Sequence, residues 1–240
     1  GIWFDQGGPR ASAKAAFLEG NTDGVLFVNR GITGDNEKAG ISDFLVSEFY
    51  DQIPAGDTDA LPVHHSQVNR IFGGSWWACG GRATADARGL FRYTVRVAAT
   101  EGQRHAGVDW ACGPYLDQSW ESGVRELMHR FGELVRRNRR AIYGTVPSTA
   151  YVTKSGSTLD RDAWGVATES LDRASVFLHV LNPVSHGALR LAPAADGTSF
   201  EGASMLDGRP ARLVPAAHGY DLGTDGDWSD VDTVVVLRRH

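Results

Sequence analysis

The chain opens with Gly1-Ile2-Trp3-Phe4-Asp5-Gln6-Gly7-Gly8-Pro9, and this stretch, with the residues after it, decides the fold class of the first half. Its apolar run ends in a carboxylate, and the glycines and proline then turn the chain. Residues 9–19 carry apolar side chains at helical spacing, and Gly20 marks the expected stop. Residues 25–28 form a second apolar run, which ends in Asn29-Arg30. Strand, helix and strand in this order predict a parallel α/β sheet.

The alternation of short apolar runs and helical patterns continues toward residue 145. Residues 43–48 form a third apolar run that ends in a carboxylate, residues 84–101 have an apolar helical face, and residues 106–112 are strand-like. The most periodic segment predicts a helix that starts from a cap near Asp117 or Ser119. Its apolar positions are Val124, Leu127, Met128, Phe131, Leu134 and Val135.

Beyond Tyr143-Gly144-Thr145 the pattern changes to short apolar or alternating runs separated by Gly, Pro, Asp and Asn. Runs of this kind without helical periodicity predict an antiparallel β-sandwich. The sequence therefore predicts two domains, residues 1–145 and residues 146–240. The expected strands of the second domain lie at residues 164–168, 175–181, 188–191, 211–214 and 233–237.

Composition and charge exclude several functional classes. Lysines and arginines number 24 against 29 aspartates and glutamates, which gives a net charge of −5 and argues against a nucleic-acid or anionic-membrane surface. No stretch approaches the roughly 18 to 20 apolar residues of a membrane span. The one basic cluster falls at the end of a predicted helix, where cations offset the helix dipole. It consists of Arg136, Arg137, Arg139 and Arg140.

The cysteines leave the compartment open. Cys79 and Cys112 are the only two, and neither has a second Cys or His at zinc-ligand spacing, so no metal site is expected. They are compatible with a disulfide in a secreted chain and with two buried free thiols. A secreted or periplasmic location is slightly favoured over a cytoplasmic one. Because nearly all basic residues are arginines, the composition also suggests a GC-rich bacterial source.

Five segments, taken in order, resemble the second half of the barrel of glycoside hydrolase family 29, the α-L-fucosidases. They are Trp3-Phe4-Asp5, Asn29-Arg30, residues 34–48, residues 102–114, and the helix end Arg139-Arg140-Ala141-Ile142-Tyr143-Gly144-Thr145. Residues 165–168, 176–181 and 232–234 are similar to the C-terminal β-sandwich of that family. Each motif is short, but their collinear order covers nearly the whole chain.

The resemblance implies α/β plus all-β architecture: an incomplete (β/α)8-like barrel followed by an antiparallel β-sandwich. A complete barrel needs about 250 residues, which is more than precede the sandwich here. The family's earlier strands must then come from elsewhere, and a companion polypeptide or fragment that completes the barrel is expected. A self-associated half-barrel and a sequence that omits the first part of the protein are the alternatives.

The resemblance also implies the chemistry of an exo-acting retaining hydrolase of α-L-fucosides or a closely related sugar, with no metal or organic cofactor. Retaining glycosidases use two carboxyl groups, one as nucleophile and one as acid/base. Asp5 matches the family's nucleophile, although a turn aspartate would look the same. Glu48 matches a carboxylate of one branch and is the expected acid/base. In another branch the acid lies in a Pro-Trp-Glu sequence, where this chain has Pro62-Val63-His64, so a His64-assisted reaction and a site without an acid stay open.

Further positions are candidate sugar contacts. Trp3 and Arg30 match family positions that contact the sugar and the nucleophile, although Trp3 also suits ordinary barrel packing. His64 and His65 fit hydrogen bonding to sugar hydroxyls better than a shared metal, because adjacent residues of an extended segment face opposite ways. Trp76-Trp77 suits a subsite wall or an aromatic pair at the core edge. The rival function is a noncatalytic carbohydrate-binding or structural subunit.

Overall fold

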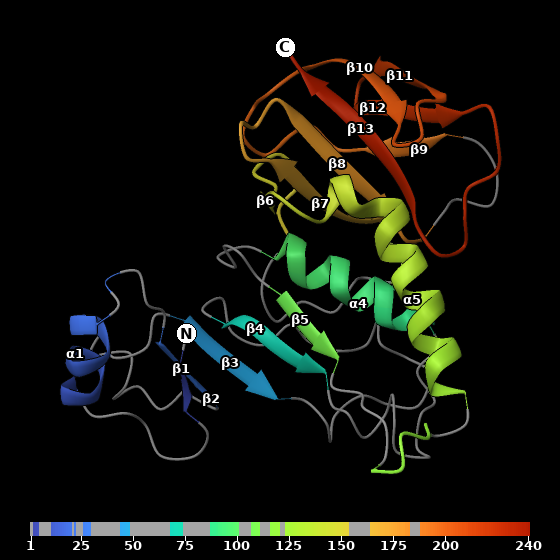
Figure 1. The fold of residues 1–240 in the computed structure, drawn as a ribbon. Helices are drawn as coiled ribbons and strands as arrows, with labels where there is room; N and C mark the ends of the chain where they lie inside the picture. The colour runs from blue at the N-terminus through green and yellow to red at the C-terminus, as the bar shows by residue number, and fades with distance from the viewer. Residues whose placement is uncertain are drawn as a thin grey trace.

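The computed structural model describes twelve parts of the 240-residue chain: residues 2–4, 11–20, 22, 26–29, 44–48, 68–73, 87–100, 107–110, 116–120, 123–153, 164–182 and 188–240. These residues form two sheets (Figure 1). The strands of the first half of the chain form a five-stranded sheet, and those of the second half form an eight-stranded sheet. Helices α4 and α5 lie at the junction between them (Figure 1).

The first sheet is parallel throughout, with strand order β1-β2-β3-β4-β5 following the chain. Sequential parallel order is what strand–helix–strand units produce, so the prediction of a parallel α/β sheet is confirmed. The elements are β1 (Ile2–Phe4), α1 (Ala11–Gly20), β2 (Leu26–Asn29), β3 (Phe44–Glu48), β4 (Val68–Gly73), α4 (Ala87–Ala99) and β5 (Gly107–Trp110).

Helix α4 is buried on nearly all sides, because it contacts β5 of the parallel sheet, helix α5, and strands β6 and β7 of the second sheet. Its core side chains Phe91, Val95 and Ala99 pack with Val166 and Leu181 of the second half. The one-sided apolar face expected for residues 84–101 therefore understates its burial. A helix that contacts both sheets ties the two halves of the chain together.

Helix α5 (Val124–Asn138) continues into the short 3-10 helix η2 (Arg139–Ala141), and the expected periodic helix is confirmed. Its expected cap is wrong. Asp117 accepts hydrogen bonds from the Ser119 backbone N–H (3.0 Å) and hydroxyl (2.5 Å), a local turn that uses its side chain ahead of the helix. The helix instead begins after Gly123, which has φ +79° and makes no side-chain cap.

The second sheet has strand order β6-β7-β8-β13-β10-β11-β12-β9 and is antiparallel in every pair. The described residues beyond 145 contain strands and no helix, as the sequence predicts, and these strands form one continuous hydrogen-bonded sheet. The sequence missed β6, β10 and β12, which are short or contain glycine. The strands are β6 (Thr145–Pro147), β7 (Gly165–Ser170), β8 (Ser175–Val180), β9 (Leu189–Leu191), β10 (Phe200–Met205), β11 (Pro210–Ala216), β12 (Gly219–Thr224) and β13 (Thr233–Arg239).

One hydrophobic core is shared by strands from both ends of this sheet. Leu178 of β8 and Leu237 of β13 are fully buried in the same cluster as Leu191 of β9 and Leu222 of β12. The sheet therefore folds over its own apolar face. An irregularity in the pairing of β10 with β13, between Phe200 and Gly202, is the kind of break that lets a sheet bend.

Candidate active site

Two of the eight expected site residues lie in described strands. Trp3 is the middle residue of β1, opposite Phe27 of β2, and Glu48 is the last residue of β3, opposite Phe72 of β4. The other six lie outside the described residues. They are Asp5, Arg30, His64, His65, Trp76 and Trp77.

The carboxyl ends of the parallel strands meet at one edge of the first sheet. Strand β1 ends at Phe4, immediately before Asp5 in the chain, and β2 ends at Asn29, immediately before Arg30. Strand β3 ends at Glu48 itself. In parallel α/β folds, ligands bind at this carboxyl edge, so this edge is the candidate active site.

The strand register places the charged residues of the first sheet on one face. Val46 lies opposite both Asn29 and Arg70, and Arg70 lies opposite Gly107. Two residues further along, Phe72 lies opposite both Glu48 and Asp109. Because residues in register share a face and residues two apart on a strand share it too, Glu48, Arg70 and Asp109 occupy positions of one face. These are the only charged residues in the five strands.

The opposite face of the same sheet is nearly apolar. By the same alternation its strand positions include two polar residues, Ser47 and Asn69; the others are apolar or glycine. They are Ile2, Phe4, Leu26, Val28, Leu45, Ile71, Gly73, Val108 and Trp110. The sequence analysis singled out neither Arg70 nor Asp109. The signal that could have found them was a charge inside an otherwise apolar strand.

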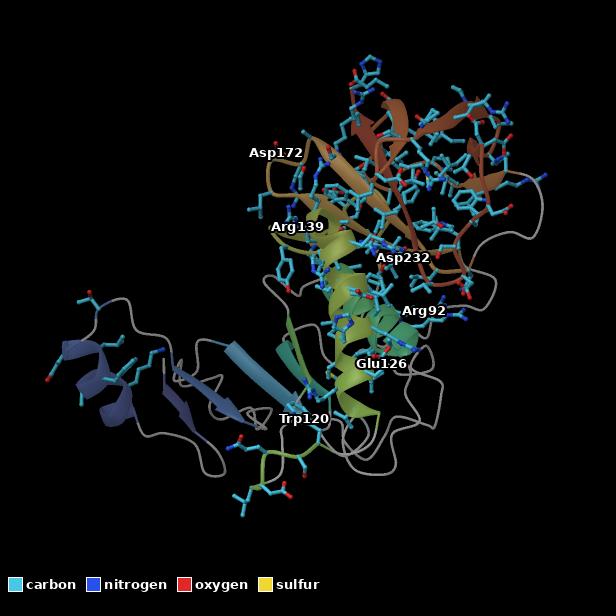
Figure 2. All side chains as sticks on the ribbon, turned by 45° about the vertical axis from the view of Figure 1, so that its right-hand side comes forward. Arg92, Trp120, Glu126, Arg139, Asp172 and Asp232 are labelled. Carbon is cyan, nitrogen blue, oxygen red and sulfur yellow. The ribbon has the colours of Figure 1, made fainter. Side chains whose placement is uncertain are left out.

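Residues 116–120, between β5 and α5, lie on the side of the sheet toward which the strand arrows point (Figures 1 and 2). Three of these residues and the start of α5 line a groove. The groove has a volume of about 620 Å³ and is lined by Trp120, Arg125 and His129, with Gln118 at a left-handed backbone position of φ +66°. An aromatic ring beside charged and polar groups is a surface that sugars can use. This segment was not expected to contribute to a site.

The buried histidine of the second half belongs to the junction between the sheets. His179 Nδ1 lies 2.8 Å from Asp232 Oδ2, and its Nε2 lies 3.2 Å from the Ala141 carbonyl oxygen. A carbonyl oxygen only accepts, so Nε2 carries a proton and donates it. Burial raises the pKa of Asp232, while His179 and the nearby Arg92 oppose the rise. Both side chains of the pair are fully buried, which gives His179 a structural role.

Arg92 of α4 strengthens the same junction. Its guanidinium donates to the Leu181 carbonyl oxygen and, at 2.8 Å, to Asn182 Oδ1 (Figure 2 labels Arg92 and Asp232). These contacts join α4 to the two residues that directly follow β8 in the chain. The cluster is enclosed, and its contacts hold the two halves together.

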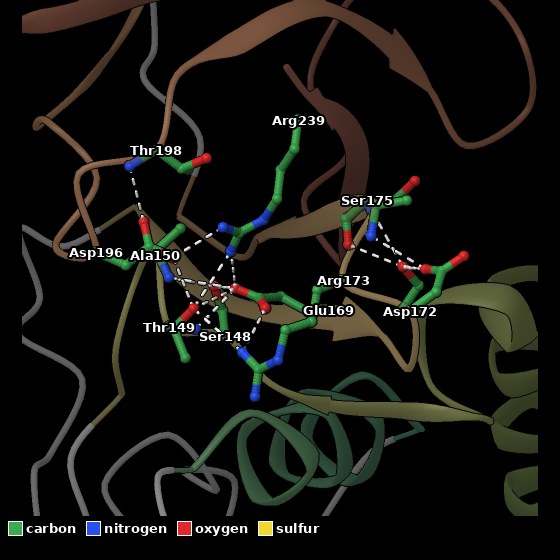
Figure 3. A network of polar contacts seen from close by, with 12 residues as sticks. Ser148, Thr149, Ala150, Glu169, Asp172, Arg173, Ser175, Asp196, Thr198 and Arg239 are labelled. Carbon is green, nitrogen blue, oxygen red and sulfur yellow. Dashed lines mark hydrogen bonds and ion pairs between the residues drawn. The ribbon is translucent and has the colours of Figure 1, made fainter.

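A second buried polar network surrounds Glu169 of β7 (Figure 3). Its Oε1 accepts from Ser148 Oγ (2.7 Å), from the Thr149 N–H (2.7 Å) and from Arg239 (2.7 Å). Burial raises the pKa of Glu169, but these hydrogen bonds, one from the Ala150 N–H and the Arg239 charge together lower the pKa below its usual range. The network ties the loop after β6 to β7 and β13.

Two kinds of feature, a membrane-spanning helix and a metal-binding cluster, are absent from the described residues. No described helix is long and apolar enough to cross a membrane. No group of three or more His, Cys, Asp or Glu side chains in the described part of the chain could hold a metal ion.

No family model and no curated protein matches the chain. Solved structures do match, among them three α-fucosidases. The α-L-fucosidase from Vibrio sp. strain EJY3 has a TM-score of 0.66 and 15% identity over 99% of this chain and 41% of its own. The GH29 α-L-fucosidase of Bacteroides thetaiotaomicron, as a trapped covalent intermediate with 2-fluoro-fucosyl fluoride, has a TM-score of 0.66 and 15% identity over 96% of this chain and 52% of its own.

The α-fucosidase of Thermotoga maritima gives the same result, with a TM-score of 0.61 and 16% identity over 97% of this chain and 51% of its own. This chain thus spans about half the length of these structures or less. Its fold is that of part of a glycoside hydrolase. More particularly, it is the fold shared by the GH29 α-L-fucosidases, so the resemblance indicated by the sequence motifs is confirmed at the level of the fold.

Proposed function

We propose that this chain carries the nucleophile half of the active site of an exo-acting retaining glycoside hydrolase that cleaves α-L-fucosides or a closely related sugar. The observation that carries the proposal is the carboxyl edge of the parallel sheet, where Glu48 ends β3 and Asp5 follows β1 in the chain. The likeness to α-L-fucosidase structures supports the same substrate class. Residues 1–145 would then be the second half of a (β/α)8-like barrel, and residues 146–240 a β-sandwich.

The spacing of the strands is compatible with a retaining reaction. Strands β1 and β3 are separated by β2 alone, so their axes lie about 10 Å apart across the sheet. Retaining enzymes hold their two carboxyl groups about 5 to 5.5 Å apart, a separation that carboxylates carried by strands so spaced can span. In this mechanism Asp5 attacks the anomeric carbon, and Glu48 protonates the leaving oxygen and later activates water.

The remaining expected residues have supporting roles in the proposal. The guanidinium of Arg30 keeps the nucleophile ionised, and Trp3 packs on the apolar face of the deoxy sugar. His64 and His65 bind sugar hydroxyls, and Trp76-Trp77 forms a subsite wall. The other barrel strands come from further polypeptide. A companion chain that supplies them stays a prediction, which the comparisons do not support.

A noncatalytic carbohydrate-binding subunit is the second candidate. It is favoured by His64, which stands where one branch of the family has a carboxylate. The two candidates differ in turnover, since a binding subunit retains the sugar without hydrolysing it.

Hydrolysis of a chromogenic α-L-fucoside by the purified chain, with and without any copurifying polypeptide, tests the proposal. Replacing Asp5→Ala should lower turnover on the order of 10⁴-fold or more, because the covalent step loses its nucleophile. The urea midpoint should stay unchanged, and azide should restore part of the rate. The matched control is Asp225→Ala, at an exposed aspartate of the second half. Full activity of Asp5→Ala would refute the assignment, and sugar binding without turnover in the wild type would favour the second candidate.

A further inference from the structure

All charged residues of the parallel strands gather on one face of the sheet, toward its carboxyl edge. Arg70 lies on β4, between β3 with Glu48 and β5 with Asp109. It stands two residues before them along the strands, since Val46 and Gly107 lie opposite Arg70, while Glu48 and Asp109 lie opposite Phe72. Arg70 is therefore the diagonal neighbour of both carboxylates.

The diagonal spacing is short enough for charge interaction. A lateral step of about 4.8 Å and an axial step of two residues, about 6.6 Å, place the Cα atoms about 8 Å apart. Long side chains at diagonal positions of one face interact across this distance. Parallel sheets are covered on both faces, and a charge in such a layer is costly unless an opposite charge accompanies it. One cation flanked by two carboxylates meets that requirement.

We infer that Arg70 and Asp109 are positioning residues that set the protonation of Glu48 in the proposed active site. The inference rests on the proposed function, in which Glu48 is the acid/base. An acid must hold its proton near the working pH, and an arginine alone would favour the carboxylate form. Asp109 offsets this, because its negative charge disfavours a second carboxylate nearby and counters the positive charge of Arg70. The charged residues of this face within the five strands are these three alone.

Opposite shifts of the pH–rate profile test the inference. The alkaline limb of the rate should follow loss of the Glu48 proton. Asp109→Asn removes the negative charge that counters Arg70, so the arginine favours the Glu48 carboxylate and this limb should move to lower pH by about one unit. Arg70→Gln removes the positive charge and should move the limb to higher pH by a similar amount. Arg70→Lys keeps the charge and should stay near the wild type. Ser47→Ala, on the opposite face of β3, is the control and should move nothing.

A second measurement does not depend on activity. Urea midpoints of Glu48→Gln, Arg70→Gln and their double variant should be non-additive, and so should those of Arg70→Gln with Asp109→Asn. The pair Ser47→Ala with Arg70→Lys should be additive. A chain that shows these couplings but no turnover would refute the proposed function and still support an interaction among Glu48, Arg70 and Asp109. Additive midpoints, or shifts of the alkaline limb in the same direction for Arg70→Gln and Asp109→Asn, would overturn the inference.

Discussion

The two sheets use charged residues in different ways. In the antiparallel sheet, buried charges have partners within the chain: Glu169 with Arg239, and His179 with Asp232. In the parallel sheet the charged strand residues share one face and lie toward the carboxyl edge, where α/β folds bind ligands. Stability and chemistry are therefore assigned to different sheets of this molecule. The second sheet holds the molecule together, and the edge of the first carries the proposed reaction.

The Glu169 network offers the largest effect on stability. Replacing Glu169→Ala removes the acceptor of several hydrogen bonds and leaves the charge of Arg239 without this partner in a largely buried position. The free energy of unfolding should fall by about 3 to 5 kcal/mol, as for other broken buried pairs. Urea unfolding measures it. The control is Glu201→Ala, whose exposed pair with Arg238 spans 3.8 Å and should contribute about 0 to 1 kcal/mol.

The same residue gives a pH signature. Because the pKa of Glu169 is lowered in the folded state, its contribution to stability is present above the unfolded pKa of about 4.3. It is lost as the pH falls through the folded pKa. The variant Glu169→Gln should therefore lose less stability than the wild type on acidification below about pH 4.3. Equal slopes for the two proteins would show that this network is not what the antiparallel sheet depends on.

A glycine substitution in the antiparallel sheet tests the packing of that sheet without changing its charge. Gly219 begins β12 at φ +121°, and an added Cβ would stand 2.3 Å from the Leu191 carbonyl oxygen and 2.6 Å from the Ala192 carbonyl carbon. Gly219→Ala should lower the free energy of unfolding by about 3 kcal/mol, from overpacking and backbone strain together.

Its matched control is Gly132→Ala in α5, where an added Cβ meets nothing within 4 Å. There alanine should raise the free energy of unfolding by about 0.5 to 1 kcal/mol, the difference between the two residues in a helix interior. A neutral Gly219→Ala variant would contradict the tight approach of β9 to β12. Neither substitution should change the Km for substrate.

Much of the fold could be predicted from sequence, for reasons that particular segments make plain. The helical spacing of Leu127, Phe131 and Leu134 is regular enough to predict α5. The short apolar runs of β7, β8 and β13 are recognisable as strands. Strand β12 could not be recognised from sequence, because its Gly-Tyr-Asp-Leu-Gly-Thr segment mixes glycine and polar residues. It forms a strand through its pairing with β9 and β11.

The site divides in the same way. Glu48 could be picked out because a charge at the end of an apolar run is conspicuous in one segment alone. Arg70 and Asp109 carry a similar signal, a charge inside an apolar strand. That they share a face with Glu48 could not be predicted, because it depends on the register between β3, β4 and β5, including an irregularity between Leu45 and Val46. Register is a property of paired strands, and no single segment encodes it.

The central claim is that the chemistry lies at the carboxyl edge of the parallel sheet, with Asp5 as the attacking group. Peptide mass spectrometry after incubation with 2-fluoro-fucosyl fluoride tests it most directly, since a slowly hydrolysed sugar marks the residue that forms the covalent bond. The account predicts a fluorofucosyl adduct on the peptide that contains Asp5, in the wild type and in Glu169→Gln, and no adduct in Asp5→Ala. An adduct on another carboxylate, or rapid hydrolysis of α-L-fucosides with no adduct at all, would contradict it.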